Sequence, residues 1–268
     1  LSAISIVTAP SAIADTAGSG NCVQTFTPSS GSATVTVTES GGFCYVAFKN
    51  TGAADSQVTF SWTRPAGLNS VDVMVIGGGG GGGARHGGGG GGGGFVQADG
   101  FAISSASTVD VAVGAGGSAS ASYTGTPGRP SYFKSSTRGL TAAGGGRGQN
   151  GSGDASGGSG GGAGWNQSAG SASLGTQTRF SDGSTLSGIS FGNAGASGAN
   201  DTNDASDNND YWAGGGGGGA GAAGENPKSN GTLTTSFLIN TSSTAVAGKG
   251  GDGKSVSWIT PAIAASNV

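Results

Sequence analysis

Charged side chains are scarce in this chain. Asp, Glu, Lys and Arg make up 9% of the 268 residues, and the net charge is −3. Disordered chains are usually far more charged, so the composition indicates a folded protein with a neutral, polar surface. The 11 Lys and Arg form no basic cluster, which excludes a nucleic-acid partner from our expectations. No apolar run approaches the ~18–20 residues of a membrane-spanning helix, so we expect no membrane span.

Side chains that perform catalysis are equally scarce. His86 is the only histidine, and no carboxylate or serine stands near it in a recognisable catalytic motif. No Gly-Lys-Ser or Gly-Lys-Thr directly follows any of the unbroken glycine runs at 77–83, 87–94 and 214–219, so these runs do not match phosphate-binding loops. We therefore expect no enzymatic activity and no organic cofactor.

Only two cysteines are present, Cys22 and Cys44, and they flank a strand-like segment. Their spacing suits a single disulfide bond, and two buried free thiols are the alternative. A disulfide implies an oxidising compartment. We accordingly expect a secreted protein that is extracellular or at the cell surface.

Glycine, in contrast, is abundant: 61 residues, about three times average usage. It forms unbroken runs at 77–83, 87–94 and 214–219. Such runs often serve as flexible linkers. Here, however, the strand-like segment 71–76 leads directly into the first run, and the apolar segment 95–98 follows the second. The alternative that we favour is a set of extended rods with three residues per turn, which hydrogen-bond to one another because no Cβ keeps them apart.

Collagen is excluded, since the chain has no strict Gly-X-Y period and only 7 prolines. Residues 247–253 fit a short rod at the edge of such a bundle, where every third position is open to a side chain.

Segments that alternate apolar and polar residues, or that are continuously apolar, predict β-strands between turn residues. They cover residues 33–38, 43–48, 57–62, 71–76, 108–113, 233–239 and 255–259. No segment has the pattern of an amphipathic helix. We expect a mainly β fold, a β-sandwich with inserted glycine rods and almost no α-helix. The expected divisions are an N-terminal arm (1–20), sandwich strands (21–76), the rod bundle with interleaved strands (77–253) and a C-terminal strand of the same sandwich (254–268).

The N-terminal arm is apolar and has no helical period. Residues 12–14 read Ala-Ile-Ala, which resembles a signal-peptide cleavage site. Three interpretations stay open: a donor strand that inserts into a neighbouring subunit, a strand within the same molecule, and a remnant of an uncleaved signal. In the first, the residues that contact the neighbour are Leu1, Ile4, Ile6 and Val7.

Loops at the ends of the rods supply the candidate contact residues for a ligand or an interface. Aromatic side chains at such places stack on sugars or fill interfaces, although a lid over the rod ends is the plainer interpretation. The candidates are Arg85, His86, Trp165, Asn166, Tyr211 and Trp212.

An acidic stretch at 200–210 is the candidate metal site. Asp204, Ser206, Asn208 and Asp210 alternate along it, and oxygen ligands in this spacing suit calcium. The glycine and the closing glutamate of an EF-hand loop are missing, so a solvated loop is the alternative.

The stretch 62–67, the strand 71–76 with the glycines after it, and residues 94–96 and 109–117 together resemble a bacterial and phage glycine-rich domain. Residues 125–133 and 142–146 fit the same pattern. The resemblance covers roughly 60–257, so the cysteines and the arm lie outside it. Relatives occur in secreted surface proteins and phage tail adhesins, and the glycine-rich extracellular module of anaplastic lymphoma kinase is similar in style. The resemblance implies hexagonally packed polyglycine-II helices on a jelly-roll-like β-sandwich.

For function, the leading hypothesis is a secreted structural subunit that binds copies of itself and forms an extracellular filament or surface layer through N-terminal strand donation. The alternative is a phage tail-tip or cell-surface adhesin that binds a glycan or an outer-membrane receptor through the rod-end loops.

Overall fold

The computed structural model describes residues 15–30, 32–119, 123–135, 139–150, 155–164, 190–200, 212–229, 232–233 and 245–257. Within these ranges the fold is mainly β, as expected, and its one helical turn is the 3₁₀ helix η1 (Gly20–Cys22). The strands are β1 (Asp15–Ala17), β2 (Gln24–Ser30), β3 (Ala33–Ser40), β4 (Phe43–Asn50), β5 (Gln57–Thr63), β6 (Ser70–Ile76), β7 (Phe95–Ala102), β8 (Thr108–Gly114), β9 (Ser131–Lys134), β10 (Gly139–Ala142), β11 (Ser190–Phe191), β12 (Ala199–Asn200), β13 (Trp212–Ala213), β14 (Lys228–Ser229), β15 (Thr232–Leu233) and β16 (Ala245–Val246).

One layer of the fold is a six-stranded antiparallel sheet with the order β1-β2-β5-β8-β9-β10. Its centre is the pair β5 and β8, which runs in register from Gln57 opposite Gly114 to Thr63 opposite Thr108. The alternation of the sequence dictates which face is buried. In β5, Val58, Phe60 and Trp62 are buried while the residues between them are more exposed.

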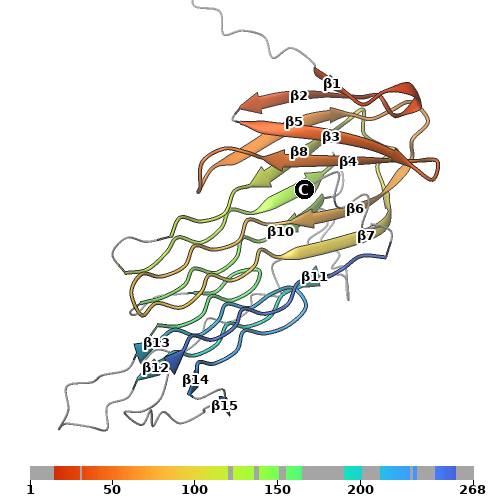
Figure 1. Cartoon of the computed structure of the whole chain (residues 1–268). Coiled ribbons are helices and arrows are strands. Elements are labelled where there is room, and N and C mark those ends of the chain that lie inside the picture. The colour runs from red at the N-terminus through yellow and green to blue at the C-terminus, as the bar shows by residue number, and fades with distance from the viewer. Residues whose placement is uncertain are drawn as a thin grey trace, which may run out of the picture.

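The second layer has two parts, the β3–β4 hairpin and a three-stranded sheet of order β11-β7-β6. The hairpin turns at Gly41 and Gly42, whose φ values of 60° and 79° are those that a two-residue turn between twisted strands requires. In Figure 1 the β3–β4 hairpin lies in front of β5 and β8, and β6 and β7 lie below it near β10.

The two layers enclose one apolar core. It contains buried side chains of β2, β5, β8, β9 and β10 from the first layer and of β6 and β7 from the second, with Val35 and Phe48 of the hairpin packed against it. Phe26, Phe48 and Phe60 form an aromatic cluster with ring centroids 5.1–6.4 Å apart. Burying a side chain of this size stabilises the fold by about 1.5–3 kcal/mol. The apolar core is therefore built from side chains of the strands.

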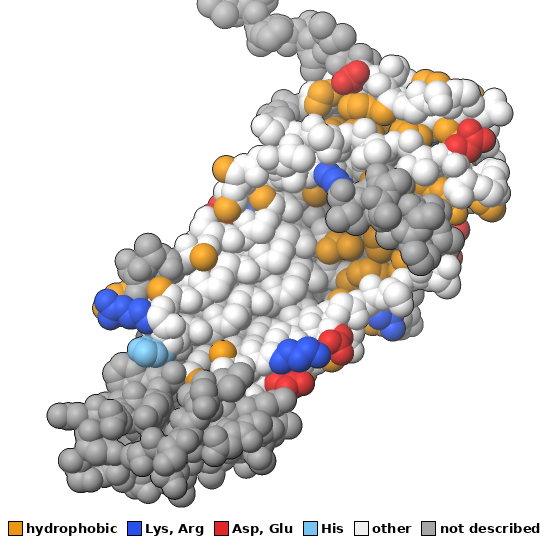
Figure 2. Space-filling view, viewed as in Figure 1, with side chains coloured by type: hydrophobic (Ala, Val, Ile, Leu, Met, Phe, Trp, Pro, Cys, Tyr) orange, Lys and Arg blue, Asp and Glu red, His pale blue; other side chains and the backbone are white. Residues whose placement is uncertain are grey.

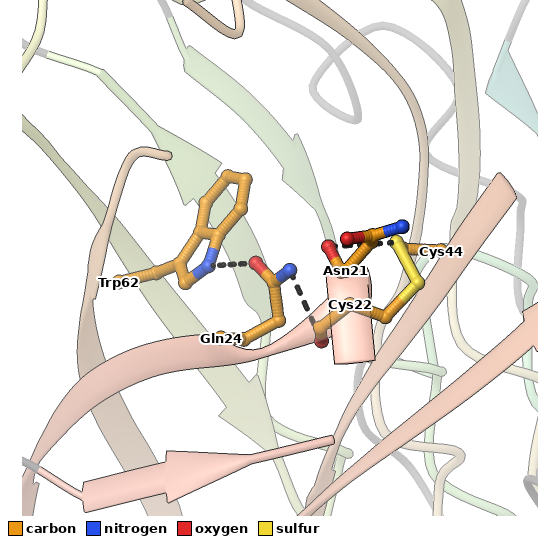
Figure 3. The surroundings of a disulfide bond; sticks show 5 residues. All are labelled: Asn21, Cys22, Gln24, Cys44 and Trp62. Atoms are coloured by element: carbon orange, nitrogen blue, oxygen red, sulfur yellow. Dashed lines mark hydrogen bonds between the residues drawn. A yellow bond between two sulfur atoms is a disulfide. The ribbon is translucent and has the colours of Figure 1, made fainter. Parts of the chain in front are cut away.

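The disulfide bond between Cys22 and Cys44 is present and confirms that prediction. It joins η1 to the start of β4, with the two Cα atoms 5.5 Å apart. Beside it, the indole N–H of Trp62 donates to Gln24 Oε1 at 3.0 Å, and Gln24 Nε2 donates to the Cys22 carbonyl at 3.4 Å (Figure 3). The disulfide end of the hairpin is thus tied into the main sheet.

The glycine-rich segments extend from one end of these sheets (Figure 1). β6 ends at Ile76 where the first glycine run begins, and β7 starts at Phe95 where the second run ends. Of the predicted C-terminal strand, residues 255–257 are not in a strand, and the rest lies outside the described residues. The arm is described only from Asp15, which begins β1.

Candidate functional site

The glycine bundle is the feature that distinguishes this fold. We use this name for the extended segments within 77–94, 115–119, 123–130, 143–149, 155–164, 193–198, 214–225 and 247–253, which hydrogen-bond to one another through their backbones. In Figure 2 its surface is a broad white face with few hydrophobic or charged side chains. The runs are therefore packed in the structure, and the flexible-linker alternative is wrong for them.

The hydrogen bonds of segment 77–84 repeat every three residues. One set of amides faces the antiparallel segment 88–94, and the next set faces the antiparallel segment 123–129. The first set joins Gly77, Gly80 and Gly83 to the carbonyls of Gly94, Gly91 and Gly88 at 2.8–3.0 Å. The second joins Gly78, Gly81 and Ala84 to the carbonyls of Arg129, Thr126 and Tyr123 at 2.9 Å. A β-strand repeats every two residues, so this segment is not a sheet strand.

Neighbouring segments run in either direction. Segment 87–94 is antiparallel to 77–84 but parallel to 214–219, to which Gly89 donates at the carbonyl of Gly215 and Gly92 at that of Gly218. A rod whose donors and acceptors point outward around its axis can bond to neighbours of both polarities. The bundle therefore needs no particular chain direction.

The reason for glycine is the missing Cβ and not an unusual backbone. None of the described glycines of the bundle has a φ in the left-handed region. A Cβ on Gly78 or Gly80 would instead lie closer than 3.0 Å to a carbonyl oxygen of a neighbouring segment. On Gly79 and Gly82 it would find its nearest atom at 3.6 and 3.9 Å, so every third position of this run is open. In 214–219 all six positions are closed.

At the bundle's edge the requirement for glycine relaxes. In segment 247–253 a Cβ is excluded at Gly248 and Gly251 but meets nothing closer than 3.8 Å at Gly250. Lys249 and Asp252, which are exposed, form an ion pair of 3.1 Å that raises the pKa of the lysine. This is the expected edge rod, although two positions in three, rather than one, are open to side chains.

An aspartate is among the residues that connect the strands to the bundle. Asp55 lies between β4 and β5, and its carboxylate accepts hydrogen bonds from Thr126 Oγ1 at 2.6 Å and Ser118 Oγ at 2.7 Å. These two bonds lower the pKa of the Asp55 carboxyl below its ordinary value. Arg129 Nε donates to the Asp55 carbonyl at 3.0 Å. No local sequence pattern indicates this connection.

The turn between the first two glycine runs lies at the end of the bundle remote from the core. Figure 2 shows a blue and pale blue patch there, beside the white face. Arg85 is exposed, and its guanidinium carbon lies 5.6 Å from the centroid of the Tyr123 ring. His86 is half-buried. Arg85 is therefore a surface residue of the bundle end, and Tyr123 is a neighbour that sequence reasoning missed.

Among the remaining predicted contact residues, only the backbone of Trp212 is described, and it stands two residues before Gly214, which packs against Gly87 at this end of the bundle. Trp212 begins β13. Outside the described residues lie Trp165, Asn166, Tyr211, the arm residues Leu1, Ile4, Ile6 and Val7, and the calcium candidates Asp204, Ser206, Asn208 and Asp210. In the ranges that the structure describes, no group of three or more His, Cys, Asp or Glu is placed to hold a metal ion. No helix there is long and apolar enough to cross a membrane.

The fold and its bundle define a class: mainly β proteins in which glycine segments pack backbone to backbone on an apolar core. A family model described as a glycine-rich domain matches residues 54–263, and the chain belongs to this family. The match includes Asp55 and the whole bundle but leaves out the disulfide. Comparison with curated proteins and with solved structures gives no significant match.

Proposed function

We propose that this protein is a secreted structural subunit that assembles with copies of itself into an extracellular filament or surface layer. The observation that carries the proposal is an incompletely paired sheet edge. β1 covers only residues 24–26 of β2, and within the described residues nothing pairs with the rest of β2 on that side. An exposed strand edge is a template for another chain.

The occupant that we propose for this edge is the N-terminal arm of a neighbouring copy. A donated strand supplies backbone hydrogen bonds, and its apolar residues supply specificity. In an extended arm Ile4 and Ile6 share one face, while Ser5 lies on the other. Because each copy donates one arm and accepts one, the contact propagates head to tail. The disulfide supports an oxidising, extracellular setting.

We further propose that the bundle is a polyglycine-II array. Its support is the three-residue repeat of the hydrogen bonds and the exclusion of Cβ atoms by neighbouring backbones. Such rods rise about 3.1 Å per residue, so a run of seven or eight residues is roughly 22–25 Å long. A crystal structure tests this directly. Backbone angles near φ −75° and ψ +145° support it, and β-strand angles near φ −140° exclude it.

Light scattering and electron microscopy of the purified chain test the assembly. We expect polymers that disappear on deletion of residues 1–14 and in the double variant Ile4→Asp, Ile6→Asp. The matched control is Ala3→Asp with Ser5→Asp, which adds the same charge on the opposite face of the extended arm and is expected to leave assembly intact. A monomeric intact chain, or polymers that survive the deletion, would contradict the proposal.

A second candidate is a surface adhesin that binds its target at the remote end of the bundle. The observation in its favour is the exposed Arg85 above the Tyr123 ring at this end. Replacing the turn 84–86 by Gly-Gly-Gly is expected to abolish adhesion to target cells while polymers still form. Unchanged adhesion would exclude this end as the binding surface.

A further inference from the structure

Arg85 occupies a backbone conformation that favours glycine. Its φ is 55°, and among the described residues the only other non-glycine with positive φ is Asp55. A side chain in this region strains the backbone, more so for arginine than for aspartate, which tolerates it better. Glycine runs stand on both sides of this turn, yet the one position where glycine would relieve strain carries an arginine. Strain of this kind collects at functional sites.

The turn holds Arg85 in place through the backbone of the preceding residue. The Ala84 carbonyl accepts hydrogen bonds from the amide of Gly87 at 2.9 Å and from Asn150 Nδ2 at 2.9 Å. The Ala84 amide donates to the Tyr123 carbonyl at 2.9 Å. Asn150 is itself buried, with 7% of its surface exposed. The backbones of the arginine turn and of the tyrosine segment are therefore fixed relative to each other.

The side chains of these two residues form a platform at the surface. The Arg85 guanidinium lies over the Tyr123 ring, and 58% of the tyrosine surface is exposed. No carboxylate of the described residues pairs with Arg85. A guanidinium that no carboxylate occupies keeps its fork of N–H groups able to donate in pairs to one anion.

We propose that Arg85 and Tyr123 form a subsite for an anionic polysaccharide. The guanidinium fork binds a carboxylate or sulfate of the sugar, and the exposed tyrosine surface packs against the apolar side of the sugar ring. This inference rests on the adhesin candidate above and names its ligand class. The protein has a net charge of −3, so general attraction does not draw a polyanion to it and the binding depends on local chemistry.

Binding of the full-length protein to immobilised polysaccharides tests the subsite. The probes are alginate, which carries carboxylates, dextran sulfate, and neutral dextran. The repeated anions of a polymer strengthen a weak single site through avidity, which makes it measurable. We expect binding to at least one polyanion and none to dextran. If replacing Arg85 weakens binding to alginate alone, the ligand is a carboxylate. If it weakens binding to dextran sulfate alone, the ligand is a sulfate.

The decisive variant is Arg85→Gly, because glycine suits the φ of 55° and the turn is expected to fold at least as stably. We expect it to weaken polyanion binding about tenfold or more while melting temperature and assembly stay unchanged. Arg85→Lys keeps the charge but loses the planar fork, so we expect its affinity for the polyanion to lie between those of the wild type and Arg85→Gly. Tyr123→Leu is expected to weaken binding as well.

The matched control is Lys134→Gln, which removes one positive charge from an exposed position of β9. It is expected to bind as the wild type does. Three results would overturn the proposal: Arg85→Gly binding both polyanions at wild-type strength, Lys134→Gln losing as much affinity as Arg85→Gly, or wild-type protein preferring neither polyanion to dextran. Because assembly is followed in parallel, loss of this subsite is distinguishable from failure of the filament hypothesis.

Discussion

The two halves of this molecule reach a fixed structure by opposite means. In the sandwich, backbone hydrogen bonds join neighbouring strands, and apolar side chains such as Phe60 and Val109 fill the space between the layers. In the bundle, the backbone itself fills that space, and hydrogen bonds in several directions replace the side-chain core. The stability of the sandwich depends on the apolar side chains that fill its core, and the stability of the bundle depends on the absence of Cβ atoms.

The cost of this second solution is conformational entropy, since glycine loses more backbone freedom on folding than any other residue. The strands reduce that cost where they hold the ends of the rods, as β6 and β7 do for the first two runs. The comparison therefore predicts that the sandwich acts as the foundation for the bundle, and four measurements test it.

The largest effect is expected from the apolar core. Phe60→Ala should lower the free energy of unfolding by about 3–5 kcal/mol, because a buried aromatic side chain leaves a cavity. Phe43→Ala, at a position 68% exposed, should change it little. Guanidinium unfolding followed by tryptophan fluorescence measures both. Similar values for the two variants would show that the strands do not form the foundation.

The disulfide is expected to come next. Cysteines separated by 22 residues constrain the unfolded chain by about 3 kcal/mol in the loop-entropy model. Cys22→Ser with Cys44→Ser should therefore lower the free energy of unfolding by this amount, and reduction of the wild type with dithiothreitol should match it. If dithiothreitol also destabilises the double variant, which has no disulfide, the stability that it removes from the wild type does not come from the disulfide alone.

Within the bundle, two adjacent glycines should respond in opposite ways. Gly80→Ala places a methyl group against the Gly146 carbonyl and should lower the free energy of unfolding by about 2–3 kcal/mol. Gly79→Ala places its methyl group in ordinary contact with the Gly91 carbonyl oxygen, at 3.6 Å, and should be neutral or stabilise by up to about 1 kcal/mol, since alanine restricts the unfolded chain. Thermal unfolding compares them. Equal effects would refute the three-residue alternation of closed and open positions.

The smallest effect is expected at the connection between the halves. Because the pKa of Asp55 is lowered in the folded state, its contribution to stability is present above the ordinary value of 3.8 and disappears as the pH falls through the folded value. Asp55→Asn should thus lower the melting temperature at pH 7 and approach the wild type in acid. Asp110→Asn, an exposed aspartate of β8, is the control. A constant difference across pH would exclude the carboxylate as the cause.

The sequence predicts the parts of this fold that depend on local pattern. Alternating segments correctly indicate β3, β5 and β8, and the Gly41-Gly42 pair indicates the hairpin turn. Strand β2 is not predicted, since it contains Pro28 and only one large apolar residue, Phe26. The packing of the glycine runs follows from their strand-like flanks.

What depends on distant residues is not predictable in this way. Asp55 meets Ser118 and Thr126, which lie 63 and 71 positions away, and nothing near Asp55 in the sequence indicates them. Tyr123 reaches Arg85 for the same reason, through segments that become neighbours only when the rods stack. The only local indication of this site is Arg85, a large charged residue between two glycine runs. It correctly predicts a turn but not the φ angle of that turn.

The three-residue repeat of the hydrogen bonds also determines how such a protein changes in length during evolution. Three extra glycines at the end of run 77–83, matched by three at the start of run 87–94, add one more hydrogen bond between the runs and leave the register of the existing hydrogen bonds unchanged. One or two extra residues would rotate the open positions inward against a neighbouring carbonyl. A change of nine nucleotides in each of the two runs together therefore preserves the pairing, whereas shorter in-frame changes do not.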